Sequence, residues 1–198
     1  MAEIKAVMVK ELREKSGAGM MDCKNALTES DGDFDKALDI LRKKGIAKAA
    51  KRADREAKEG TIYAYIHPGS KLGVLVEVNC ETDFVANTDN FQEFSKNIAM
   101  HIAAANPLAI KREELEQAVI DKEMEIFKEQ AKASGKPDNI IEKITQGRLE
   151  KYYAEVCLLE QAYVKDMDVT IQQLLTDTIA KVGENITIKR FARFRIGE

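Results

Sequence analysis

The chain has 198 residues, of which 44% are hydrophobic and 33% are charged, and its formal net charge is −3. This length suits one medium domain with a small one beside it, since domains commonly hold roughly 100–200 residues. No apolar stretch reaches the ~18 residues needed to span a bilayer, and the first residues lack the basic and then apolar segments of a secretory signal. The three cysteines form no CxxC pair, which is typical of a reducing compartment, and we expect a cytoplasmic location.

Three short helices are predicted within residues 1–44. Apolar residues recur there at helical spacing, glycine-containing breaks separate the helices, and Asp33 is a suitable N-cap for the third helix. Two lysines and Gly45 are typical stop signals for that helix. A core this small is marginal by itself, so we expect the bundle to lean on a partner or on the main domain. The next segment, 45–58, is predicted to be a basic linker helix.

Residues 59–198 are predicted to form an α+β core domain. A β-hairpin, four helices and a final strand are expected along it, at 61–79, 88–106, 112–133, 138–160, 170–182 and 186–196. The two middle helices are expected to form a helical hairpin joined at 134–137. The final strand is expected to add to the β-hairpin, giving a small antiparallel sheet packed with helices. On that strand we expect Phe194 and Ile196 on the core face, with Arg193 on the other face.

The segment at 42–58 is strongly basic. It holds eight basic and two acidic residues, a local charge of +6. Such a segment can bind phosphates, although a solvated helical linker is the commoner explanation. Proteins that bind single-stranded nucleic acid usually place aromatic residues among the basic ones, and this segment has none. An RNA-associated protein is therefore kept only as the alternative function, and no direct nucleic-acid contact is otherwise expected.

Motifs for catalysis, metal binding and nucleotide binding are missing from the sequence. It contains no GxxxxGK[ST] phosphate loop, no GxGxxG fingerprint and no HExxH or paired-cysteine spacing. A nucleophile pair of Cys80 with His67 or His101 is conceivable, and a Cys–His hydrolase is a further alternative. Histidines in a chain of this size more often pack or form hydrogen bonds. We therefore expect no enzyme activity, no cofactor, no metal and no direct nucleotide binding.

The segment Asn79–Asn87 joins a predicted strand to a predicted helix and places Asp83 beside Phe84. Loops that rigid elements hold in place are favoured positions for function. An aromatic residue at such a junction has two readings. Phe84 either plugs the core or points outward as a wedge toward a partner.

Three segments together resemble the bacterial elongation factor Ts family. They are Lys10–Leu27, Glu77–Ala86 and Ile179–Ile186, the last followed by Arg190 and Phe191. They occur in the family's order and cover essentially the whole chain. The resemblance implies a translation elongation factor that binds elongation factor Tu with GDP, disturbs its magnesium and phosphate site, and promotes exchange of GDP for GTP. It also implies that the N-terminal bundle is ubiquitin-associated-like and docks on the nucleotide domain of elongation factor Tu.

The resemblance assigns the main partner-binding site to the family's intrusion motif, which here is Thr82, Asp83, Phe84 and Val85. In relatives this motif presses between helices of elongation factor Tu near its magnesium ion. Asp83 is expected either to hydrogen-bond the partner or to cap the turn that aims Phe84. Thr82 and Val85 are expected to shape that turn.

Secondary partner contacts are expected at Gly19, Met20, Met21 and His67. For the two methionines the alternative is that they fill the core of the bundle. For His67 the alternative is an ordinary exposed histidine at the tip of the hairpin.

The length of the chain also bears on oligomeric state. Longer family members carry a duplicated core and an inserted coiled coil, whereas 198 residues leave room for one core copy. The chain resembles the short form, which implies a homodimer that supplies both halves. No cysteine lies near the final strand, and the dimer is therefore expected to be non-covalent.

Overall fold

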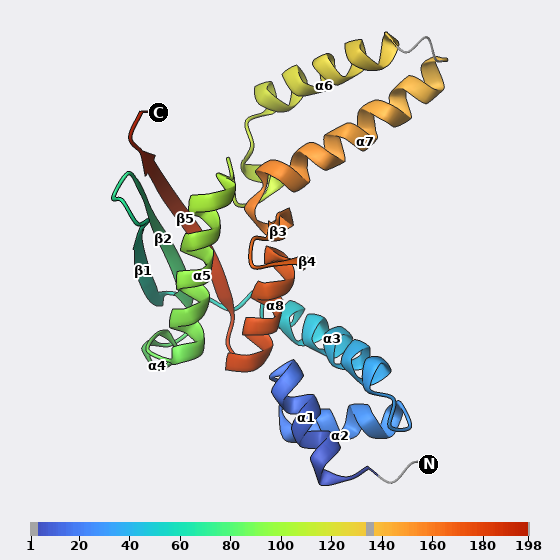
Figure 1. Ribbon diagram of the computed structural model, residues 1–198, viewed down its shortest axis with the longest axis vertical. Coiled ribbons are helices and arrows are strands. Elements are labelled where there is room, and N and C mark those ends of the chain that lie inside the picture. Colours follow the sequence, from blue (N-terminus) through green and yellow to red (C-terminus); the bar gives the residue numbers. More distant parts are fainter. Residues whose placement is uncertain (1–3, 134–136, 198) are drawn as a thin grey trace. The chain divides into compact units, whose positions relative to one another are not determined.

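The computed structural model of the protein describes residues 4–133 and 137–197 (Figure 1). Helices and small sheets alternate along the chain, which confirms the predicted α+β class. The chain divides into two compact units. The first is built from the residues up to Ile62 with Glu77–Lys96 and Gln173–Ile188, and the second from Tyr63–Val76, Asn97–Gln172 and the residues from Lys189 onward. The predicted domain limits at residues 44 and 58 stay a prediction.

The first unit contains the predicted three-helix bundle, made of α1 (Ala6–Ser16), α2 (Met20–Glu29) and α3 (Phe34–Ala50). Helix α1 ends at Gly17, whose φ of 66° places it in the left-handed region that favours glycine. Small and medium apolar side chains from all three helices form the core: Val9, Leu12, Cys23, Ala26, Leu27, Ala37 and Leu41.

Helix α3 begins as predicted but does not end as predicted. The side chain of Asp33 caps it by accepting the backbone N–H of Lys36 at 3.1 Å. The expected stop at Gly45 is wrong, because α3 continues to Ala50 and a turn follows at 51–54. Gly45 is buried with its Cα facing Ala180, where an added Cβ would lie 3.7 Å from the alanine Cβ. That separation is an ordinary van der Waals contact, so residue 45 is an interior helix position that packs against α8, and no separate linker helix begins there.

A three-stranded sheet has the order β1-β2-β5, with β1 at Glu59–Ile66, β2 at Leu72–Cys80 and β5 at Ile186–Arg195. The predicted hairpin and final strand are thus confirmed. In the second unit the N–H of Ile196 donates to the carbonyl of Lys71 at 3.0 Å, which sets the end of β5 beside the start of β2. Helix α5 (Asp89–Ala105) lies along the sheet (Figure 1). Its predicted apolar stripe is buried at Phe91, Phe94, Ile98 and Ile102.

The expected orientation of the last part of β5 is wrong. Phe194 is 68% exposed and Ile196 is also exposed, whereas Arg193 is half-buried and its Nε donates to the carbonyl of Ala103 at 3.4 Å. Alternation along β5 is interrupted because Lys189 and its neighbour Arg190 are both exposed. Beyond that point the residues that simple alternation assigns to the core lie on the open face.

The remaining elements of the second unit are two short 3-10 helices, two long helices and two short strands. They are Arg112–Glu114 (η1), Gln117–Lys132 (α6), Asp138–Val156 (α7), Leu158–Glu160 (η2), Ala162–Tyr163 (β3) and Asp166–Thr170 (β4). Helices α6 and α7 form the predicted helical hairpin (Figure 1). Most of the predicted join at 134–137 lies outside the described residues. The pairing of β3 with β4 was not predicted.

Helix α8 (Ile171–Val182) begins directly after Thr170, the predicted cap, and most of it belongs to the first unit. It closes at Gly183, where φ is 84° and the N–H donates to the carbonyl of Ile179 at 3.0 Å. The predicted stop at this glycine is therefore confirmed. Across residues 4–133 and 137–197, no helix is both long and apolar enough to cross a membrane.

Candidate functional site

The predicted site lies on a single helical turn, α4 (Asp83–Ala86), which directly follows β2 in the first unit. Thr82 is the N-cap: its backbone is extended and its hydroxyl accepts the N–H of Val85 at 3.3 Å. At the other end, the side-chain amide of Asn87 donates to the carbonyl of Asp83 at 2.8 Å. The cap of the turn is thus Thr82, and of the two roles considered for Asp83 its side chain does not take this one.

Burial along α4 determines which side chain points outward. Val85 is only 5% exposed and Ala86 is buried with it, whereas Phe84 is 78% exposed. Successive residues of a helix point about 100° apart, so anchoring Val85 and Ala86 in the core turns Phe84 toward solvent. The reading of Phe84 as a core plug is therefore wrong for this structure. The turn presents a large aromatic ring outside the fold.

A distant carboxylate holds the peptide that leads into this turn. The backbone N–H groups of Glu81 and Thr82 both donate to Oε2 of Glu184, at 3.1 and 3.0 Å. The hydroxyl of Thr82 donates to Oε1 of Glu184 at 2.7 Å, and its lone pair remains available for the N–H of Val85. Sequence reasoning missed Glu184 as a site residue. Its only signal was its place in the third family segment, next to the helix stop.

Asn185 adds a second connection to the same junction. Its N–H donates to Oε1 of Glu81 at 2.7 Å, and its buried side-chain amide donates to the carbonyls of Ala53 and Arg55, at 3.3 and 2.8 Å. The guanidinium of Arg55 also lies 3.5 Å from the carboxylate of Glu81. Asn185 therefore connects the segment that follows α3 to Glu81, the residue that leads into the turn with Phe84.

The thiol next to the turn is poorly suited to nucleophilic chemistry. Cys80 is fully buried and its Sγ donates to the carbonyl of Thr82 at 3.1 Å. Burial, assisted by the charge of Glu184, raises the pKa of Cys80 to about 11, and the thiolate that a nucleophile requires is scarce at neutral pH. This observation weakens the Cys–His hydrolase alternative.

His101, one of the two histidines considered as a partner of Cys80, has structural hydrogen bonds at both ring nitrogens. His101 is fully buried, with its Nε2 2.8 Å from Oε1 of Gln161, while its Nδ1 accepts the N–H of Val164 at 3.3 Å. These partners indicate the neutral tautomer with the proton on Nε2. Burial lowers the pKa of His101. Both ring nitrogens are thus occupied within the second unit.

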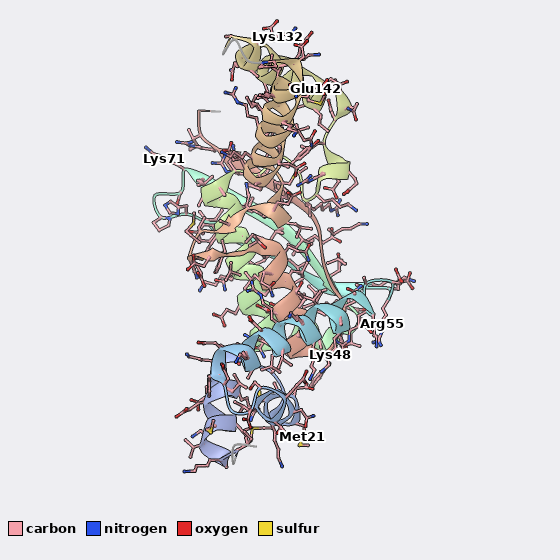
Figure 2. The ribbon with its side chains drawn as sticks, turned by 90° about the vertical axis from the view of Figure 1, so that its right-hand side faces the viewer. Met21, Lys48, Arg55, Lys71, Lys132 and Glu142 are labelled. Atoms are coloured by element: carbon pink, nitrogen blue, oxygen red, sulfur yellow. The ribbon has the colours of Figure 1, made fainter. Side chains whose placement is uncertain are left out.

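The two methionines of the bundle lie at the start of α2 and point outward. Met20 is exposed and Met21 is 67% exposed, and Figure 2 shows Met21 at the outer surface of the bundle. The core position is taken instead by the fully buried Cys23. Gly19 precedes them as the N-cap residue of α2, with φ −63° and ψ 148°. The reading of Met20 or Met21 as core filler is therefore wrong.

His67 lies at the hairpin turn of the second unit, and its side chain is exposed. The hydroxyl of Tyr65 lies 2.9 Å from its Nδ1. Backbone bonds close the turn: the N–H of His67 donates to Leu72 and the N–H of Ser70 donates to His67, both at 2.9 Å. Thr82–Val85 are thus gathered on one turn with Gly19–Met21 elsewhere in the same unit, whereas His67 belongs to the other unit.

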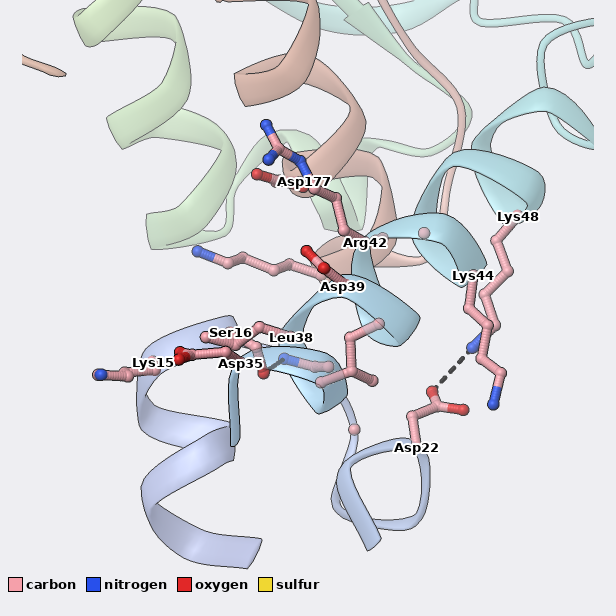
Figure 3. A pocket seen from close by; sticks show the side chains of 16 residues that line it. Lys15, Ser16, Asp22, Asp35, Leu38, Asp39, Arg42, Lys44, Lys48 and Asp177 are labelled. Carbon is pink, nitrogen blue, oxygen red and sulfur yellow. Dashed lines mark hydrogen bonds and ion pairs between the residues drawn. The ribbon is translucent and has the colours of Figure 1, made fainter. Parts of the chain in front are cut away.

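A groove of about 490 Å³ lies within the first unit (Figure 3). Nine charged side chains of both signs line it: Lys15, Asp22, Asp35, Asp39, Arg42, Lys44, Lys48, Asp177 and Lys181. The ammonium of Lys48 pairs with Asp22 at 2.7 Å, and burial raises the pKa of Asp177, which lies near Arg42. Because positive and negative side chains are mixed along it, the groove does not present the concentrated positive field that a nucleotide phosphate requires.

The basic segment at 42–58 is also partly neutralised. Four of its cations form ion pairs with carboxylates, in the pairs Lys44–Glu29, Lys48–Asp22, Arg55–Glu81 and Lys58–Glu56. Exposed pairs of this kind stabilise a fold little, but each lowers the local positive potential. The pattern therefore favours a solvated, structural segment over an RNA-binding surface.

Within the part of the chain that the structure describes, no group of three or more histidine, cysteine or acidic side chains could hold a metal ion. The site consists instead of an exposed aromatic residue on a turn that buried side chains and long-range hydrogen bonds hold in place. Such an arrangement is suited to binding another macromolecule.

Comparisons with known proteins agree with the segments that carry the resemblance. A family model described as elongation factor TS matches residues 46–198. Elongation factor Ts of Thermoanaerobacter sp. is 62% identical over 195 residues, which cover 98% of this chain and 96% of the relative. That of Geotalea daltonii is 59% identical over 195 residues, with 98% and 90% covered, and that of Fervidobacterium nodosum is 60% identical over 196 residues, with 99% and 100% covered. The chain therefore belongs to the elongation factor Ts family of translation elongation factors.

Proposed function

We propose that this protein is the guanine nucleotide exchange factor of elongation factor Tu. It binds elongation factor Tu with GDP, disturbs the magnesium and phosphate site of that partner, and promotes exchange of GDP for GTP. The observation that carries the proposal is Phe84, a largely exposed aromatic ring on a capped and anchored turn. Family membership supplies the partner, and the geometry of α4 supplies the group that would enter it.

Phe84 can contribute a substantial part of the binding free energy. Burying a phenylalanine side chain contributes roughly 1.5–3 kcal/mol, and aromatic anchors at interfaces often act as hot spots worth ~2 kcal/mol or more. When Phe84 inserts near the magnesium ion, that binding energy is coupled to a shift of the loops that hold magnesium and phosphates. Magnesium neutralises and positions the phosphates, and its displacement weakens nucleotide binding. The coupling is reciprocal, because nucleotide then weakens the factor by the same amount.

One phenylalanine cannot supply the whole effect. Loosening a nucleotide by ~10⁴-fold requires about 5.5 kcal/mol of differential binding free energy. We therefore propose a broad interface in which Asp83 hydrogen-bonds the partner beside Phe84. The exposed methionines Met20 and Met21, next to Gly19, and the exposed His67 add secondary contacts.

We propose that the protein acts through binding alone and is not an enzyme. The nucleotide, the magnesium ion and the hydrolysis of GTP all belong to elongation factor Tu, and no cofactor of its own is required. The buried thiol of Cys80 and the committed ring of His101 agree with this view. A translation elongation factor works where ribosomes translate, and we propose a cytoplasmic location.

The test is the release of fluorescent GDP from elongation factor Tu, followed by stopped flow with and without this protein. Phe84→Ala should fold normally and slow factor-stimulated release by at least about tenfold, which corresponds to roughly 1.4 kcal/mol at the barrier. Ile46→Ala is the matched control, since it truncates an exposed apolar side chain on α3 of the same unit. An unchanged release rate in well-folded Phe84→Ala would show that the wedge role is wrong.

We further propose that two copies of the chain form a non-covalent homodimer through the open face of the sheet. In the second unit, a groove of about 580 Å³ is lined by four exposed apolar side chains: Ile66, Leu75, Phe194 and Ile196. A contiguous apolar face of this kind is typical of an interface. All three cysteines are buried and unpaired, so no intermolecular disulfide is expected.

Sedimentation equilibrium at micromolar concentration tests the dimer. The wild-type protein should sediment at twice the chain mass of 22.2 kDa, and Phe194→Glu should shift it toward the monomer because a charge would be buried at the interface. Lys189→Glu, an exposed charge change on the same strand, is the control. A wild-type protein that sediments only as monomer would defeat the two-chain proposal.

A further inference from the structure

We propose that Glu184 is a positioning residue for nucleotide exchange, which fixes the direction in which the turn presents Phe84. This proposal rests on the exchange function proposed above. Glu184 lies about a hundred positions along the chain from the turn, and its side chain reaches the turn from the junction between α8 and β5. Its hydrogen bonds go to Glu81 and Thr82, and its effect on Phe84 is exerted through these two residues.

The two carboxylate oxygens of Glu184 hold the point at which the chain leaves β2 and enters α4. Oε2 accepts the consecutive N–H groups of Glu81 and Thr82, and Oε1 accepts the hydroxyl of Thr82. Hydrogen bonds to an ionised acceptor are about twice as strong as neutral ones. Three of them converge on the consecutive residues Glu81 and Thr82, which lead from β2 into the turn and set the direction of its axis.

The turn has other contacts that form it, and Glu184 is therefore needed for its direction more than for its existence. Thr82 caps the turn locally, and Val85 and Ala86 anchor it in the core. The cap joins residues three positions apart, and the two anchoring side chains belong to the turn itself. A single four-residue helical turn is marginal in water, because nucleation fixes several dihedral angles for few hydrogen bonds. Without the carboxylate, the turn can form and still sample several orientations.

The junction that carries Glu184 is itself held on both sides. Gly183 closes α8 in the left-handed region with its N–H bonded to Ile179. Asn185 is buried and uses its backbone N–H for Glu81 and its side-chain amide for the carbonyls of Ala53 and Arg55. Glu184 thus projects from a fixed point of the first unit, which is a requirement for a residue that orients another.

Preorganisation explains how this arrangement assists exchange. A side chain that is already held in its binding orientation loses less conformational freedom when it enters a partner. Glu184 should therefore matter at the step in which Phe84 inserts and nucleotide leaves. In the interface proposed here, initial docking goes through the bundle and His67, and the turn enters afterwards. Loss of Glu184 should then lower the maximal release rate more than it changes the concentration of factor that gives half of that rate.

The first experiment measures stimulated GDP release over a range of factor concentrations. Glu184→Gln keeps the size of the side chain but removes the charge and one acceptor oxygen. We expect the maximal rate to fall about three- to tenfold, with the half-saturating concentration changed less than twofold. Glu184→Asp retains the charge with a shorter reach and should recover part of the loss. Glu93→Gln makes the same chemical change at an exposed position on α5 of the same unit and should match wild type.

A double variant separates positioning from a general structural role. If Glu184 acts through Phe84, Glu184→Gln should cause no further slowing in a Phe84→Ala background. Fully additive losses in the double variant would overturn the proposal. A maximal rate for Glu184→Gln equal to wild type, with Phe84→Ala slow, would also overturn it while leaving the exchange function intact. If wild-type protein fails to accelerate release, the exchange function fails and this role fails with it.

Amide hydrogen exchange on the free protein supplies a readout that needs no partner. In Glu184→Gln, or in Glu184→Asp should the first variant unfold, the amides of Glu81 and Thr82 should exchange about tenfold faster than in wild type. Amides in the middle of α5 should keep their protection, which excludes global destabilisation. Unchanged protection at Glu81 and Thr82 would show that the carboxylate does not hold the turn.

Discussion

One turn precedes strand β2 and another follows it, and the two turns are held in place by different contacts. The turn before it carries the exposed His67 and closes on itself, through backbone bonds between residues at most five positions apart. The turn after it carries the exposed Phe84 and is held by the carboxylate of Glu184, by the buried Val85 and by Asn185 acting through Glu81.

The two kinds of anchoring suit the turns to different roles. A turn closed by local backbone bonds can form early and independently, but its exposed side chains remain free to move. A turn held from distant parts of the chain is oriented only when the unit has folded, and it then presents its side chain in one direction. We associate the first type with adaptable secondary contacts and the second with an insertion that needs a defined direction.

The largest change in stability is expected within α4 itself. Val85→Ala should lower the free energy of unfolding by about 2 kcal/mol, because it removes buried methyl groups and leaves a cavity. Phe84→Ala should change it by less than about 0.5 kcal/mol, as for most exposed positions. Urea unfolding followed by circular dichroism measures both. Equal destabilisation by the two variants would mean that Phe84 packs against the fold in solution, contrary to its exposed position on the turn.

Thr82→Val should lower the free energy of unfolding by about 1 kcal/mol. The change keeps the shape of the side chain but removes the helix cap and the hydrogen bond to Glu184. Ser70→Ala in the hairpin turn is the control, since that turn closes through backbone bonds. The same unfolding measurement applies. A cost for Ser70→Ala as large as that for Thr82→Val would remove the distinction between the two turns.

A smaller change in the free energy of unfolding is expected from pH, through the buried His101 and its hydrogen bond to Gln161 in the second unit. Burial lowers the pKa of His101 below its ordinary value of 6.5. At pH above 6.5 the imidazole is neutral in the folded and the unfolded protein, and its protonation takes nothing from the free energy of unfolding. As the pH falls below 6.5, the unfolded chain binds a proton that the folded chain resists, and stability declines. Thermal unfolding between pH 7.5 and 5 should show this slope, and His101→Gln should reduce it. An identical slope in that variant would assign the pH dependence to other groups.

The smallest effect is expected for His67→Ala. Its backbone bonds are retained and only the contact with Tyr65 is lost, and the free energy of unfolding should change by less than about 0.5 kcal/mol. Stimulated GDP release should slow only a few-fold if the residue makes a secondary contact. A loss as large as that for Phe84→Ala would reverse the ranking of the two turns.

Features that depend on near neighbours in the chain could be predicted from the sequence. The hairpin followed from alternating apolar residues around a Pro-Gly turn, the stripe of α5 from its 3.6-residue period, and the cap at Asp33 and the stop at Gly183 from the residue types themselves. The segment with Phe84 was identified because an acid and an aromatic residue meet where a strand gives way to a helix.

Features that depend on distant partners could not be predicted. Nothing local in the sequence distinguishes Glu184 from the other acidic residues, since its role arises from the backbone N–H groups that the fold brings to it. Gly45 resembled a helix stop because Ala180 of α8, against which it packs inside a continuing helix, lies far along the chain. The outward direction of Phe194 follows from an interruption of the alternation at Lys189, which a period-two pattern does not anticipate.

The uninterrupted course of α3 has a consequence for how this family can vary in length. The helix contributes Ala37 and Leu41 to the bundle core and, one turn further on, places Gly45 against Ala180. One inserted or deleted residue between Leu41 and Gly45 would rotate one contact about the helix axis by about 100° relative to the other. The spacing of these two contacts therefore acts as a fixed angular register. Related sequences should tolerate insertions after Ala50 far more readily than within this stretch.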